Sequence, residues 1–123
     1  MPISASEKPE EASAFNAILR EFGKRPQIYG KISAFGLGRS SAGGTKRTLA
    51  DYRPLLDRYF DTFGADRVFG GAYFSQGRTN PDLDLMREYL STKPRAVAEK
   101  FFWKNSLKTY KWVHRAPNQP RLA

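Results

Sequence analysis

The sequence predicts an α/β fold in which two short strands, joined by a helix, pair in parallel. Residues 26–35 alternate between two faces, as strands do, and residues 67–74 read as a short buried strand followed by a glycine-bearing loop. Residues 51–64 lie between them with helical periodicity, and a helical crossover joins parallel strands. Nine Phe, six Tyr and two Trp among 123 residues are enough for one core but not for two.

Helical patterns also precede and follow the strands. Apolar residues at helical spacing predict a first helix over 9–23, and the S/T-x-x-D spacing of Thr48 and Asp51 predicts a helix start. Pro81 favours the start of a third helix, and a last helix is expected over 94–113. We therefore expect helix, strand, helix, strand, helix, helix.

The first predicted strand has two different faces. Because side chains alternate along a strand, one register places Ile28, Gly30 and Ile32 on one face and Lys31 and Ser33 on the other. A slip of one residue would exchange the two faces.

Composition excludes several classes of protein. The chain has no cysteine, no apolar run of about 20 residues that would span a bilayer, and no secretory signal pattern at its start. We expect a flexible leader over 1–8, one domain over 9–113, a flexible tail over 114–123 and a cytoplasmic location without membrane contact. The net charge of +9 favours a polyanionic partner such as nucleic acid, and a solvated basic surface is the alternative.

The glycine-rich segment 36–47 is a candidate anion site. It does not fit a Walker loop, because Thr45 separates the last glycine from Lys46, and it lacks the third glycine of a dinucleotide fingerprint. Amides at the start of the following helix, beside Arg39, Lys46 and Arg47, are suited to an anion. A loop without a ligand is the other interpretation.

The last predicted helix carries a basic stripe next to aromatic residues. Such a helix contacts nucleic acid or an anionic membrane, or it packs its aromatic face and exposes its lysines to water. The stripe consists of Lys100, Lys104, Lys108, Lys111 and Arg115, and the neighbouring face of Trp103, Leu107 and Tyr110.

Catalytic constellations are poorly represented. His114 is the single histidine, so the chain cannot build a multi-histidine metal site or supply a serine nucleophile with a well-placed base. Asp82 and Asp84 lie in the first turn of a predicted helix, where carboxylates suit the helix dipole. These residues predict no hydrolytic site.

Three segments in order resemble the carboxyl-terminal end of the amidohydrolase-related family, which includes lactonase-like hydrolases. The segments are "RPQIYGKISAFG", "YRPLLDRYFDTFGADRVFGG" and "KFFWKNSLKTYKW". The matching residues are Lys31, Ile32 and Ser33, then 63–70, then Asn105, Leu107 and Tyr110. The resemblance covers roughly residues 14 to 112.

The resemblance implies a partial (β/α)₈ TIM barrel, with about two βα units that correspond to strands seven and eight and with flanking helices. Enzymes of this family place the active site at the carboxyl ends of the strands and often use a divalent metal such as zinc. The histidine ligands of the family lie on strands that this chain does not contain, so the sequence implies no bound metal or other cofactor.

The family's catalytic aspartate, which ends the eighth strand, aligns with Ala72. A methyl group neither accepts a proton nor binds a metal. The resemblance still implies that Lys31, Ser33 and Arg39 point toward the former site and bind a small carboxylate or a lactone.

Three functional hypotheses follow. The first is a truncated or degenerate amidohydrolase-like protein without a complete active site, which self-associates or pairs with a chain that completes the barrel. The second is a hydrolase of lactones or amides that works after assembly with a partner chain. The third is a basic module that binds nucleic acid or another polyanion.

Overall fold

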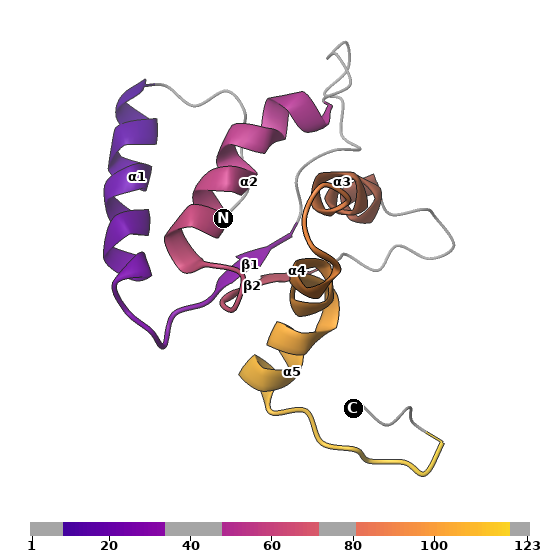
Figure 1. The fold of residues 1–123 in the computed structure, drawn as a ribbon. Coiled ribbons are helices and arrows are strands. Elements are labelled where there is room, and N and C mark those ends of the chain that lie inside the picture. Colours follow the sequence, from indigo (N-terminus) through magenta and orange to yellow (C-terminus); the bar gives the residue numbers. More distant parts are fainter. Residues whose placement is uncertain (1–8, 34–47, 72–80, 119–123) are drawn as a thin grey trace, which may run out of the picture.

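The computed structural model describes residues 9–33, 48–71 and 81–118, and it shows helices around a small sheet (Figure 1). Its elements are α1 (Pro9–Gly23), β1 (Gly30–Ile32), α2 (Leu49–Phe63), β2 (Val68–Gly70), α3 (Pro81–Leu90), α4 (Arg95–Glu99), a π-helical segment η1 (Lys100–Lys104) and α5 (Asn105–Tyr110). The predicted order of helices and strands is confirmed.

The two strands pair in parallel, as the helical crossover predicted. Gly30 lies opposite Val68, and Ile32 lies opposite Gly70. In this register Gly30 and Ile32 are buried, whereas Lys31 between them is exposed. The predicted assignment of the two faces of the first strand is therefore confirmed.

The expected partial (β/α)₈ barrel, with two βα units as strands seven and eight, is wrong. The described chain forms a small helix-rich fold around an open sheet of two strands, each three residues long. Strands this short carry too few cross-strand pairs to dominate the architecture, so helix packing does so instead. The face that would point into a barrel is occupied here by Tyr110, whose ring centroid lies 5.6 Å from that of Phe69.

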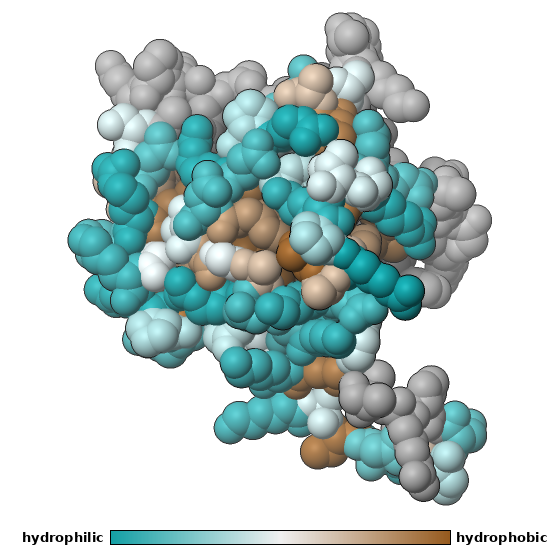
Figure 2. Space-filling view, in the orientation of Figure 1, coloured by the Kyte–Doolittle hydropathy of each residue, from teal (hydrophilic) through white to brown (hydrophobic). Residues whose placement is uncertain are grey.

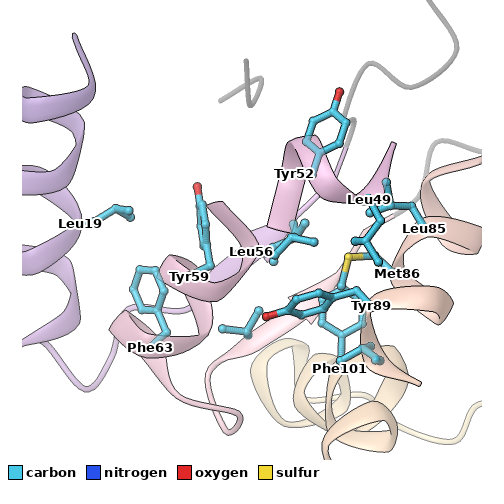
Figure 3. Close-up of a cluster of buried hydrophobic side chains, with 13 residues drawn as sticks. Leu19, Leu49, Tyr52, Leu56, Tyr59, Phe63, Leu85, Met86, Tyr89 and Phe101 are labelled. Carbon is cyan, nitrogen blue, oxygen red and sulfur yellow. The ribbon is translucent and has the colours of Figure 1, made fainter. Parts of the chain in front are cut away.

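Helix α2 is the centre of the hydrophobic core. Its buried side chains Tyr52, Leu56, Tyr59 and Phe63 recur at helical spacing. Figure 3 shows this row between Leu19 of α1 on one side and the side chains of α3 on the other; these include Leu85, Met86 and Tyr89. Aromatic side chains bury large areas, so those in this core help to stabilise so small a sheet.

The ends of α2 match their sequence signals. The backbone N–H of Thr48 donates a hydrogen bond to Oδ2 of Asp51 over 2.6 Å, which confirms the predicted helix start. Pro54 lies in the interior of α2, near its start. Gly64 follows the last helical residue with φ of 70°, a conformation that favours glycine.

The last predicted helix, over 94–113, differs most from expectation. It is interrupted by the π turn η1 and ends at Tyr110, because Lys111 adopts a left-handed conformation with φ of 49°. A π turn brings residues five apart onto one face, and Lys104 accordingly donates a hydrogen bond to Glu99 over 2.8 Å. The periodicity of the lysines gave no sign of this extra residue.

Two polar side chains join distant parts of the chain. The Arg67 guanidinium donates hydrogen bonds to the carbonyls of Gly23 and Arg25 over 2.9 and 2.8 Å, and so holds the end of α1 against β2. The amide of the buried Asn105 donates to the carbonyls of Ala65 and Val68 over 2.7 and 2.8 Å. Both residues belong to segments that carry the family resemblance, and their contacts here are structural.

Candidate anion-binding site

Lys31 lies on the outer face of the sheet, opposite the core. Its Nζ donates a long hydrogen bond of 3.4 Å to the hydroxyl of Tyr110, and it lies 5.8 Å from the centroid of the same ring. The two residues are 79 positions apart in the sequence. The fold therefore brings a lysine of β1 to the end of α5.

Gly71 places Lys31 and Ser33 side by side. Its N–H donates to the carbonyl of Ile32 over 2.8 Å, which continues the strand pairing. A Cβ at this position would clash with Cε of Lys31 and would lie 3.3 Å from Cβ of Ser33. The missing side chain thus leaves room for the lysine to lie across the strand end.

The aromatic residues beneath Lys31 form a platform. Phe69 is buried, and its ring packs edge to face against Tyr110 and lies 6.5 Å from Tyr29. More than half of Tyr110 remains exposed, at 56%. The sequence singled out Tyr110 as part of an apolar helix face, but nothing in it indicated that this ring would meet Lys31.

Of the predicted ligand-binding residues, the structure places two together, Lys31 and Ser33. Arg39, Lys46 and Arg47 lie outside the described residues, as does Ala72. The described part of the candidate site therefore lies on the outer face of the sheet.

The predicted lysine stripe is partly neutralised by acidic residues. Nζ of Lys100 lies 2.7 Å from Asp66, and Glu99 contacts both Lys104 and Arg95. Hydrogen bonds from Lys100 and from Lys104, respectively, hold the pKa values of Asp66 and Glu99 below their ordinary values. Within the described ranges, Lys31 has no carboxylate at ion-pair distance, and its Nζ contacts the hydroxyl of Tyr110.

The chain beyond α5 adds further basic and aromatic residues. Trp112 is 58% exposed, and its backbone N–H donates to the carbonyl of Leu107 over 3.2 Å, which ties it to the helix end. Lys111 stands between Tyr110 and Trp112 and is exposed. We call Lys31, Tyr110, Lys111 and Trp112 the basic-aromatic surface; Lys31 contacts Tyr110, and the exposed Lys111 and Trp112 follow Tyr110 in the chain.

Hydrophilic residues cover much of the described surface in the view of Figure 2, and the segment after α5 extends from the body at its lower end. Among the described residues there is no group of three or more His, Asp or Glu that could hold a metal ion. The same residues contain no helix that is long and apolar enough to cross a membrane.

No family model, curated protein or solved structure matches this chain.

Proposed function

We propose that the protein binds single-stranded nucleic acid through the basic-aromatic surface. The observation that carries the proposal is the meeting of Lys31 with Tyr110, an exposed ring, at a distance of 3.4 Å between Nζ and the hydroxyl. Lysines attract phosphates, and exposed aromatic rings stack on unpaired bases of any sequence.

The electrostatics of the chain support a polyanion as the ligand. The net charge of +9 creates a long-range attraction for negative partners. Local ion pairs neutralise Lys100 and Lys104, so the attraction acts mainly through other cations, including Lys31 and Lys111. A small carboxylate held by Lys31 and Ser33 is the lesser alternative, since one exposed lysine binds a single charge weakly.

Exposed rings favour single strands over a duplex. Tyr110 and Trp112 expose 56% and 58% of their surface, and bases are available for stacking only when they are unpaired. A duplex offers phosphates to the lysines but no base faces to the rings. The proposed ligand is therefore a single strand without sequence preference.

Fluorescence anisotropy with a labelled single-stranded oligonucleotide tests the proposal. We expect Tyr110→Ala and Trp112→Ala each to weaken binding by about 1–3 kcal/mol, the usual contribution of one stacked base. Arg87→Gln is the matched control for charge removal, because Arg87 is exposed on α3 and paired with Asp84. Lys31→Gln should weaken binding and lower its salt dependence, whereas Arg87→Gln should change neither.

Binding that is equally strong at low and physiological salt would contradict the proposal. So would an affinity for a duplex, or for a polyanion without bases, as high as that for the single strand. Tight binding of simple carboxylates without binding of oligonucleotides would favour the small-molecule alternative.

Kinship with the amidohydrolase-related family, without its chemistry, is a second proposal. It is supported by the structural contacts of Arg67 and Asn105, which both lie in the resembling segments. On this proposal the segments kept contacts that stabilise the chain, while the position of the catalytic acid became Ala72. Hydrolysis of simple lactones by the chain alone, dependent on added zinc and abolished by a chelator, would contradict it.

A further inference from the structure

Tyr29 lies next to the basic-aromatic surface, on the same face of the sheet. It precedes Lys31 by two residues, and side chains two apart along a strand point to one side, about 7 Å from each other. Gly30 between them faces the core, where a Cβ would meet the ring of Phe63. Tyr29 itself is only partly buried. The outer face of the sheet therefore carries a second tyrosine in addition to Tyr110.

Both tyrosines pack against one buried ring. The centroid of Phe69 lies 6.5 Å from that of Tyr29 and 5.6 Å from that of Tyr110. Phe69 is paired with Lys31 in the strand register and lies on the outer face, yet it is only 3% exposed, so neighbouring side chains cover it. The interplanar angles of 59° and 82° show that neither tyrosine stacks flat on Phe69. The three rings thus form one aromatic platform.

Lys31 adjoins both tyrosines of this platform. Tyr29 is its neighbour along the strand, and the hydroxyl of Tyr110 lies 3.4 Å from its Nζ. Figure 1 shows the two strands between α2 and α5, the helix that ends at Tyr110. One cation therefore lies beside two rings that come from different parts of the chain. In a single strand of nucleic acid, one phosphate likewise lies between two bases.

We propose that Tyr29 is a second stacking platform, so that the outer face binds one dinucleotide step with its bases on Tyr29 and Tyr110 and the linking phosphate on Lys31. This inference rests on the proposed function and extends it, because it adds a residue outside the basic-aromatic surface and defines the smallest ligand. Aromatic rings that stack on successive bases, beside a cation that follows the backbone, are the two components of single-strand sites. The only other role that its contacts give Tyr29 is to cover Phe69.

Fluorescence anisotropy of the full chain with a labelled oligothymidylate tests the inference. Tyr29→Leu keeps an apolar cover over Phe69 but removes the ring, and it should raise the dissociation constant by roughly tenfold, the effect of one lost stacked base. Tyr29→Phe keeps the ring and should bind within about twofold of the parent protein. Phe22→Leu is the matched control and should leave binding unchanged, because Phe22 is a 40% exposed ring on α1, which packs on α2.

A strand of the same length without bases separates stacking from a structural role. If Tyr29 only covered Phe69, its replacement would disturb the outer face and weaken binding of a fully abasic strand as well. On the proposal, Tyr29→Leu should bind the abasic strand as the parent protein does, whereas Lys31→Gln should weaken the binding of both strands. Circular dichroism checks that each variant is folded.

Photocrosslinking gives a readout that does not depend on affinity. An oligonucleotide that carries 5-iodouracil couples to aromatic side chains in contact with its bases, and peptide mass spectrometry should locate crosslinks at Tyr29 and at Tyr110. Oligothymidylate binding that Tyr29→Leu leaves unchanged, an equal loss for the abasic strand, or crosslinks at Tyr110 without any at Tyr29 would overturn this inference and leave the proposed function standing. A parent protein that binds no single strand would overturn both.

Discussion

The two faces of the β1–β2 sheet consist of neighbouring residues with opposite environments. On the inner face Ile32 and Val68 are fully buried beneath the helices. On the outer face Lys31 is exposed, and Tyr110 covers Phe69 without being buried itself. The inner face stabilises the fold, whereas the outer face offers charge and an aromatic ring to a ligand.

Glycines have different roles on the two faces. On the inner face, a Cβ at Gly30 would lie 2.9 Å from the ring of Phe63, and one at Gly70 would lie 2.7 Å from the ring of Phe101. On the outer face, the missing side chain of Gly71 gives room to the flexible stem of Lys31. A side chain at Gly30 or Gly70 would therefore meet a rigid ring that is packed in the core. A side chain at Gly71 would meet a lysine stem that can move aside.

The largest expected effect is on the inner face. Phe101→Ala should lower the free energy of unfolding by about 3–5 kcal/mol, because it empties a fully buried site against Gly70. Phe102→Ala is the control. The ring of Phe102, next to Phe101, is 37% exposed, so its removal should lower the free energy of unfolding much less. Urea unfolding followed by circular dichroism measures both. Equal losses for the two variants would show that the inner face is not the tightly packed one.

A smaller effect is expected at the polar edge of the same core. The buried Tyr89 donates a hydrogen bond to Asp57 over 2.6 Å, and burial, followed by this bond, raises the pKa of its hydroxyl above the ordinary value of 10.0. Tyr89→Phe should lower the free energy of unfolding near neutral pH by about 1–3 kcal/mol, because Asp57 loses its donor.

The same hydroxyl makes stability depend on alkaline pH. Since the folded pKa lies above the unfolded one, the stabilisation by neutral Tyr89 is complete below pH 10 and decreases as the pH rises above it. The free energy of unfolding of the parent protein should therefore fall more steeply above pH 10 than that of Tyr89→Phe. Tyr110→Phe, at an exposed ring, should leave the steep decline in place. An unchanged decline in Tyr89→Phe would contradict the assignment.

The smallest effect on stability is expected on the outer face. Gly71→Ala should displace the stem of Lys31 and change the free energy of unfolding by less than about 1 kcal/mol, because the lysine can move into solvent. It should nevertheless weaken oligonucleotide binding if Lys31 acts from its present position. Gly70→Ala, one residue earlier, should leave oligonucleotide binding unchanged. It should lower the free energy of unfolding by about 1–3 kcal/mol, because the added Cβ overpacks the site against Phe101. Urea unfolding and anisotropy on both variants separate the two faces.

The sequence predicted part of the candidate site. Alternation along the first strand placed Lys31 and Ser33 on the outer face, and the structure confirms this orientation. Tyr110 was not predicted to join them, because a contact between residues 79 positions apart leaves no local pattern. The π turn was also missed, because i, i+4 spacing describes an α-helix and carries no information on one inserted residue.

The resemblance to a barrel enzyme predicted the architecture wrongly, although the strand pairing was right. Parallel pairing requires only a helical crossover between two strands, and the sequence shows one. Closure into a barrel requires further strands, longer pairing and an inner face filled by side chains from several of them. Three-residue strands and an outer face occupied by Tyr110 leave an open sheet instead.

By itself the sequence determined the order of the helices and strands, the signals at their ends and the face on which each residue of the first strand lies. These features depend on neighbours within a few positions, where periodicity and backbone preferences act. Only the tertiary structure decided which lysines meet carboxylates, which rings are buried and which residue lies beside Lys31. Those outcomes depend on contacts between residues far apart in the chain, and these form only when the whole chain packs.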